Sequence, residues 1–175
     1  MAAKWTDFVS GDVLQAAQLN GVIDNFQDIA IFNESQASGT AGGTFTSGSY
    51  VKRTLNTTVV NNIASCSIAS SVITLPAGTF CVFASAPGFN TNMHKTRLRN
   101  TSDSSDTLLG TSEYSAAGIF VQTRSLIYGV FTIAASKNFE LQHRCETTSN
   151  TNGLGVATTF GDDCVFSIIA IARVA

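Results

Sequence analysis

The chain has 175 residues, of which 44% are hydrophobic and only 13% are charged, and its formal net charge at pH 7 is -2. This length suits one ordinary domain with a short appendage, and the apolar fraction supplies a buried core and argues against disorder. A net charge of -2 provides no basic field, so nucleic-acid binding is not expected. No run approaches eighteen apolar residues, and residues 1–5 lack the layout of a secretion signal, so we expect neither membrane insertion nor export.

Residues 10–32 have the periodicity of one amphipathic helix. Asp12 is a candidate N-cap, and Gln15 follows three residues later in capping-box position. The predicted anchor and helix seam consists of Trp5, Leu19, Val22, Phe26 and Ile29, the last four at heptad spacing. Because an isolated helix of about twenty residues is marginal, this seam needs a partner surface. Barely two heptads leave open whether that partner is its own head, sister helices in a coiled coil, or another protein.

The next residues, 33–49, combine glycines with Ser, Thr and Ala and show no periodicity. Such composition predicts a flexible linker. A phosphate-binding loop is set aside, because no lysine follows in Walker spacing. The predicted organisation is therefore an anchor helix at 1–34, a linker at 35–49 and a head domain at 50–175.

After Tyr50 the sequence changes to short runs of Val, Ile, Phe and Thr separated by turn residues. The candidate strands are residues 51–60, 63–68, 71–75, 79–86, 94–100, 107–114, 119–134, 139–146, 155–160 and 164–174. About eight to ten short strands indicate a sandwich or jelly roll. The predicted fold is mainly β, an antiparallel jelly-roll sandwich preceded by one N-terminal amphipathic helix.

The last predicted strand is apolar on both faces. Phe166 and Ile168 share one face, whereas Val165, Ile169 and Ile171 share the other. An antiparallel sheet normally has one wet face, so we expect one side to meet a neighbouring subunit. Val165, Ile169 and Ile171 are the candidate trimer interface, and residues 120–133 show a similar two-sided character.

The cysteines, the histidines and the acidic residues are the candidates for chemistry in this sequence. Cys66, Cys81, Cys145 and Cys164 are scattered without a C-x-x-C pair, so a metal site is not expected, and buried thiols are favoured over disulfides. His143 shares an apolar strand face with Cys145, which favours a hydrogen-bonded core histidine over a catalytic one. No catalytic motif is present, and the acidic pair Asp162 and Asp163 falls in a turn signal, so we expect no enzyme activity and no cofactor.

Lys95, Arg97 and Arg99 alternate along one predicted strand and therefore point to one side, and His94 is expected to flank them. The favoured interpretation is a solvated face paired with Asp103, Asp106 or Glu113 of this subunit or the next. The alternatives are an ion-pair belt between subunits and contact with acidic surface glycans.

Two parts of the sequence resemble phage proteins. Six segments of the predicted head resemble the C-terminal jelly-roll domains of phage tail-fibre and other virion surface proteins. They are ITLPAGTF at 73–80, HKTRLRN at 94–100, GTSEY at 110–114, QTRS at 122–125, FTIAA at 131–135 and ELQHRC at 140–145. WT at 5–6 and SGDVLQAAQLN at 10–20 resemble a short N-terminal element of phage structural proteins. Such jelly rolls are similar to trimeric tumour-necrosis-factor and complement heads, which implies a three-fold assembly.

The resemblance implies a non-enzymatic virion structural protein, assembled in the host cytoplasm and attached to other virion proteins by its N-terminus. No repetitive shaft separates the anchor from the head, which favours a short homotrimeric spike, fibre or fibre tip. We expect it to contact the host surface, where glycan is a candidate partner. A capsid decoration or cement protein is the alternative. A glycan-cleaving enzyme and a cellular lectin-like module are less favoured.

Overall fold

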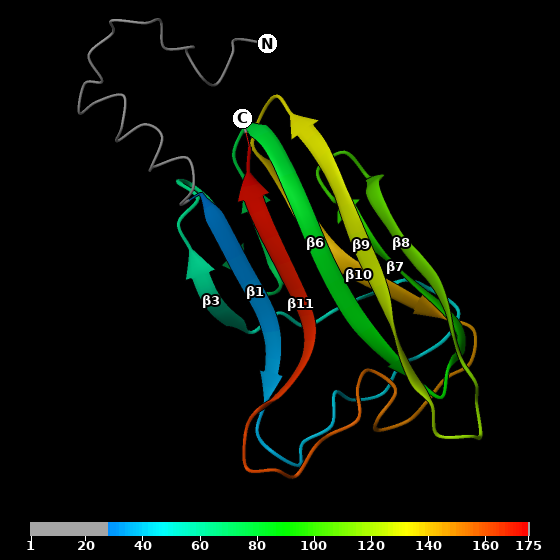
Figure 1. The fold of residues 1–175 in the computed structure, drawn as a ribbon. Helices are drawn as coiled ribbons and strands as arrows, with labels where there is room; N and C mark the ends of the chain where they lie inside the picture. Colours follow the sequence, from blue (N-terminus) through cyan, green and yellow to red (C-terminus); the bar gives the residue numbers. More distant parts are fainter. Residues whose placement is uncertain (1–27, 175) are drawn as a thin grey trace, which may run out of the picture.

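The computed structural model describes residues 28–174, which form a sandwich of two antiparallel sheets (Figure 1). The first sheet has the order β3-β1-β11-β6-β9, and the second has the order β4-β5-β10-β7-β8, with β2 also pairing with β10. The strands of the first sheet are β1 (Ile29–Gln36), β3 (Thr57–Asn61), β6 (Gly78–Phe89), β9 (Gln122–Ile133) and β11 (Cys164–Arg173). Those of the second are β2 (Val51–Lys52), β4 (Ser67–Ala69), β5 (Val72–Leu75), β7 (Asn92–Asn100), β8 (Ser105–Ser115) and β10 (Lys137–Cys145). The predicted antiparallel jelly-roll sandwich is confirmed.

The N-terminal boundary of the head differs from the prediction. Residues 29–36, which we assigned to the helix and the linker, form β1 in the middle of the first sheet, between β3 and β11. Ala30 and Phe32 face the core, whereas Ile29 and Ile31 alternate with them on the opposite side. This short apolar run fits both a helical and a strand pattern, and its pairing with β11 stabilises the strand. Of the predicted helix seam, Trp5, Leu19, Val22 and Phe26 lie outside the described residues.

The segment predicted as a flexible linker is also packed against the head. Phe45 is fully buried and pairs with Ser149 through two backbone hydrogen bonds. Gly39 N–H donates to the carbonyl of Thr158 at 2.7 Å, and Gly42 N–H donates to that of Gly155 at 2.9 Å. Glycine content therefore marks a close approach of two loops here rather than a free hinge. A Cβ at Gly42 would lie 2.8 Å from the backbone of Leu154.

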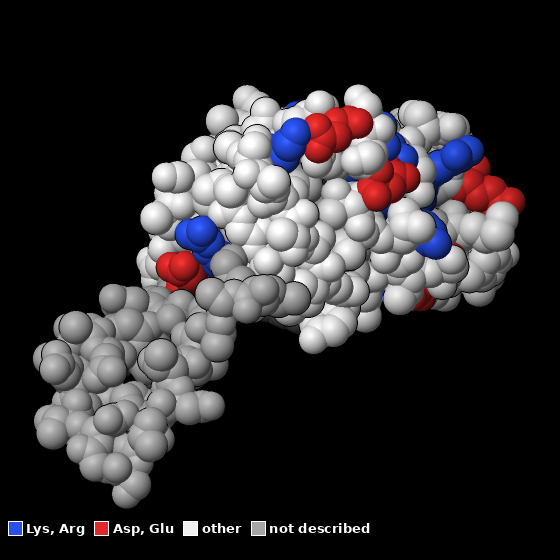
Figure 2. Space-filling view, turned by 90° about the horizontal axis from the view of Figure 1, so that it is seen from above, with Lys and Arg blue, Asp and Glu red and all other residues white. Residues whose placement is uncertain are grey.

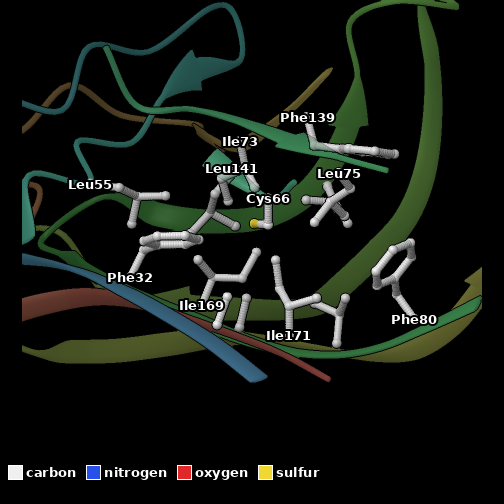
Figure 3. Close-up of a cluster of buried hydrophobic side chains, with 14 of the residues drawn as sticks. Phe32, Leu55, Cys66, Ile73, Leu75, Phe80, Phe139, Leu141, Ile169 and Ile171 are labelled. Atoms are coloured by element: carbon white, nitrogen blue, oxygen red, sulfur yellow. The ribbon is translucent and has the colours of Figure 1, made fainter. Parts of the chain in front are cut away.

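The hydrophobic core lies between the two sheets (Figure 3). It includes Phe32, Ile73, Leu75, Phe80, Val82, Leu98, Phe139, Leu141, Ile169 and Ile171, each at most 1% exposed. Burial of each such side chain contributes about 1.5–3 kcal/mol relative to exposure. Strand parity places these side chains on the facing sides of the two sheets, and it leaves the other sides free for other contacts.

At one end of the sandwich the interior is polar. Arg53 is fully buried, and its guanidinium donates to Glu34 Oε2 at 2.8 Å, to Ser167 Oγ at 2.7 Å and to the carbonyl of Leu154 at 2.7 Å. Glu34 lies near the end of β1 and Ser167 near the start of β11, so both strands are tied together here. Burial lowers the pKa of Arg53, and the Glu34 carboxylate opposes that shift. This network lies under the loops that connect the strands.

The two chain ends of the described part lie at the opposite end of the sandwich (Figure 1). Arg173 N–H donates to the carbonyl of Asp28 at 2.9 Å, so the start of β1 and the end of β11 are side by side. The long connections at residues 37–50 and 146–163 lie together at the far end. Between residues 28 and 174 no helix is long and apolar enough to cross a membrane.

Candidate functional site: an exposed apolar sheet face

The side of the first sheet that faces away from the core is apolar and exposed. On β9, Leu126, Tyr128 and Val130 point outward and are 40%, 77% and 58% exposed, while Ile127 between them is buried in the core. On β6, Phe83 also points outward and is 45% exposed. Antiparallel sheets normally place polar side chains on the face turned away from the core. This face instead has the composition of a surface that another protein covers.

The strand register joins these side chains into continuous rows. Tyr128 pairs with Phe83, Phe83 with Ala170 and Ala170 with Ile31, so one row crosses four strands. A second row runs from Val130 through Cys81 and Ala172 to Ile29. With strands about 4.8 Å apart, each row is about 14 Å long. On β11 the two rows hold only the small side chains Ala170 and Ala172, which lie between the isoleucines of β1 and the larger side chains of β9.

Charged groups occur only at the margins of this face among the described residues. Arg124 donates to Ser85 Oγ at 2.8 Å and to the carbonyl of Phe166, and Arg173 donates to the carbonyl of Ala77 at 3.0 Å. When a partner covers the two central rows, few polar groups therefore lose their contact with water. Beside Tyr128, a cavity of about 390 Å³ lined by Phe83, Leu109 and Leu126 could receive an apolar side chain of a partner.

The structure corrects the predicted interface residues. Ile169 and Ile171 are 0% and 1% exposed and pack in the core, because their side of β11 faces the second sheet. Val165 is 43% exposed near the start of β11. The outward residues in the middle of the strand are Ile168, Ala170 and Ala172, and of these the sequence had placed Ile168 on the face opposite the candidate interface. The chemical signal, a strand apolar on both sides, was correct, but parity alone does not tell which side is the core.

The charged face predicted on β7 lies on the outer side of the second sheet. Arg97 and Arg99 contact Asp106 of β8 at 3.1 Å and 2.8 Å, so these two cations are paired with a carboxylate that the sequence had offered as their partner. In the view of Figure 2, most of the visible Lys, Arg, Asp and Glu side chains lie over one part of the surface, and a wide area of that view carries none. Lys95 is the exception in this set, since no ion pair joins it to a described carboxylate.

Both histidines are buried inside the sandwich. His94 Nδ1 and His143 Nε2 are 2.9 Å apart, and His94 Nε2 is 2.8 Å from Thr123 Oγ1. The prediction of a core histidine is confirmed for His143, which is fully buried and whose ring packs at a tilt against Phe45, with the ring centres 4.5 Å apart. His94 is 3% exposed and faces inward, so the expectation that it flanks the charged face is wrong. Burial lowers the pKa of His94 to about 4 and that of His143 well below its ordinary value.

The four cysteines are free thiols, as the sequence predicted. Cys66, Cys145 and Cys164 are buried, and burial raises the pKa of Cys66 and Cys145 to about 11. Cys81 is only partly covered and lies on the exposed apolar face. Within the described part of the chain, no cluster of three or more His, Cys, Asp or Glu side chains could hold a metal ion.

The fold is similar to solved jelly-roll structures at low sequence identity. The globular domain of a zebrafish complement 1qA protein is 10% identical with a TM-score of 0.54, covering 85% of this chain and 98% of that one. Eiger TNF from S. frugiperda is 13% identical with a TM-score of 0.55, covering 84% and 92%, and murine APRIL is 5% identical with a TM-score of 0.54, covering 83% and 97%. No family model and no curated protein matches the chain. These comparisons confirm the expected likeness of the head to complement and tumour-necrosis-factor domains.

Proposed function

We propose that the chain is a non-enzymatic virion surface protein of a phage, whose jelly-roll head assembles as a homotrimer and contacts the host surface. The observation that carries this proposal is the exposed apolar face formed by β1, β11, β6 and β9. A second and a third copy of the same chain cover it. The sequence resemblance described above implies the phage origin and the three-fold symmetry.

A cyclic assembly suits this face because its two halves differ. The half on β6 and β9 carries the large side chains Phe83 and Tyr128, whereas the half on β1 and β11 carries Ile31 and Ala170. In a ring, the aromatic half of one copy packs on the aliphatic half of the next, which is a heterologous contact that closes by rotation. All three copies then bury the same surface.

The two ends of the head suit attachment and display. The chain enters the head at Asp28, next to the end of β11, and the connections at residues 37–50 and 146–163 lie at the far end. An N-terminal segment that docks on another virion protein therefore leaves those loops pointing away from the particle. This arrangement supports a short spike or fibre tip, and it serves a capsid decoration protein equally well.

The interface half of the proposal is tested by a matched pair of variants. Tyr128→Arg places a charge in the middle of the apolar face, whereas Met93→Arg adds the same charge to a side chain that is 57% exposed on the second sheet. We expect the first variant to fall to the mass of one chain, 18.4 kDa, in light scattering, while the second keeps the mass of the unmodified protein. Equal masses for both variants and the unmodified chain would show that the apolar face is not the interface between copies.

The virion half is tested on particles. An antibody raised against the full chain is applied to purified phage particles produced with the gene intact and with the gene deleted. We expect labelled particles only in the first preparation. Protein that stays in the soluble fraction of the lysate and never sediments with particles would contradict the proposed location.

A further inference from the structure

The outer side of the second sheet carries a pocket of about 520 Å³, a volume in the range of small-ligand sites. It lies over β7, β8 and β10 and is bordered by the segment before β2. Tyr50, Met93, Lys95, Glu113, Arg144 and Glu146 line it. Because it lies on the sheet opposite to the exposed apolar face, assembly of the head through that face leaves it open to solvent.

Two cations lie side by side in this pocket without a partner. The register of β10 and β7 sets Arg144 directly opposite Lys95, and both side chains point away from the core. Like charges in directly opposed positions destabilise a sheet. Neither forms an ion pair with a described carboxylate, whereas Lys52, Arg97, Arg99 and Lys137 each do. A bound anion would relieve the repulsion between Lys95 and Arg144.

The wall beside these cations is an ordered aromatic ring. The Arg97 guanidinium lies 3.7 Å from the centre of the Tyr50 ring and donates two hydrogen bonds to Gln142 Oε1. The ring is thus held in place before any ligand binds. Met93 adds a second apolar surface to the pocket. Flat apolar walls of this kind suit the C–H face of a sugar ring, since ligand sites combine apolar walls with a few polar groups.

Two carboxylates restrict the charge of the ligand. Glu113 and Glu146 lie in the same pocket and balance Lys95 and Arg144, so a polyanion or a dianion meets repulsion as well as attraction. A ligand with a single negative charge and several hydroxyl groups fits better. Its anionic group accepts from Lys95 and Arg144, and its hydroxyls donate to Glu113 and Glu146.

We propose that this pocket binds a carboxylated sugar, a uronic or sialic acid residue, of a host-surface glycan. The carboxylate lies between Lys95 and Arg144, and the sugar ring packs on Tyr50. The inference rests on the proposed role of the head in host contact and names the chemistry that this contact recognises.

The test is a calorimetric titration of the full chain with glucuronic acid, N-acetylneuraminic acid, neutral glucose and inorganic phosphate. We expect binding of at least one of the two acidic sugars that is at least tenfold tighter than binding of glucose or phosphate. Lys95→Ser and Arg144→Ser each remove a charge-assisted hydrogen bond and should weaken that binding about tenfold or more. Lys137→Ser, a control on the same sheet whose cation is paired with Asp103, should leave it unchanged.

A second measurement needs no ligand. Since Lys95 repels Arg144 in the empty pocket, we expect Lys95→Ser to keep or raise the urea midpoint of the free protein. A lowered midpoint, equal binding of glucose, equal or tighter binding of phosphate, or no binding of either acidic sugar would overturn the proposal. Light scattering of the same samples separates the two proposals. A trimer that binds no acidic sugar refutes only the ligand, and a monomer that binds one refutes only the trimeric head.

Discussion

The buried pair of Arg53 and Glu34 allows a prediction worked from the structure. Both side chains are at most 2% exposed, and Arg53 Nη2 donates to Glu34 Oε2 at 2.8 Å. Replacing Glu34 with Leu leaves the guanidinium without its counter-charge in the interior, although the acceptors on Ser167 and Leu154 remain. Loss of one partner of a buried ion pair costs about 3–5 kcal/mol, so we expect Glu34→Leu to lower the free energy of unfolding by that amount.

The measurement is urea unfolding followed by far-ultraviolet circular dichroism. All samples are kept at one protein concentration, because dissociation of an oligomer shifts the midpoint. With a slope of about 2 kcal/mol per M, the expected shift of the midpoint is about 2 M. The matched control is the double variant Glu34→Leu, Arg53→Met, which removes both charges. Because no uncompensated charge stays buried, the double variant should lose less stability than the single variant.

Either of two results would contradict this role of Glu34. If Glu34→Leu shifts the midpoint by less than about 0.5 M, the Arg53 guanidinium does not depend on Glu34 for its burial. If the double variant is less stable than Glu34→Leu, the pair contributes net stability and the cost does not arise from the charge that is left behind.

Three further predictions concern pH, thiols and packing. The pKa of His94 is 6.5 in the unfolded chain and about 4 in the folded one, so the unfolded state binds more protons between these two values. About 3 kcal/mol of the free energy of unfolding should therefore be lost as the pH falls from 6.5 to 4. Urea midpoints across this window should fall less for His94→Gln, and an equal fall would exclude this histidine as the cause. Maleimide should label Cys81 faster in Tyr128→Arg than in the unmodified protein, as peptide mass spectrometry with a Cys81→Ser control will show, and equal rates would contradict coverage of that face. Gly110→Ala should lower the unfolding free energy by about 1–3 kcal/mol, because the new Cβ meets Thr96 and Ser125, and an unchanged urea midpoint would refute this close packing.

Most of the strands could be predicted because turn residues separate them and their alternation is regular. Residues 94–100 and 139–146 were expected as strands, and the structure has β7 and β10 within two residues of those bounds. The first strand was missed, because Ile29, Ile31 and Phe32 also satisfy a helical period and the competing partner, β11, lies far away in the sequence. Residues 155–160 were expected as a strand, but they form an irregular connection that pairs with no strand.

The candidate site was predictable in kind but not in position. A sequence shows that the last strand is apolar on both sides, but which side faces the core depends on the second sheet, so Ile169 and Ile171 were assigned to the wrong surface. Tyr128 and Phe83 lie together only because β6 and β9 pair with a particular register. The unpaired cations Lys95 and Arg144 are likewise neighbours through register, 49 residues apart in the chain.

The central claim is that three copies of the chain bury the exposed apolar face against one another. Sedimentation equilibrium of the full chain across a wide range of concentrations tests it most directly, since the mass of one chain is 18.4 kDa. We expect a mass three times that value, held at dilution for the unmodified chain and lost in Tyr128→Arg. A single-chain mass at every concentration, or a stable dimer, would contradict it.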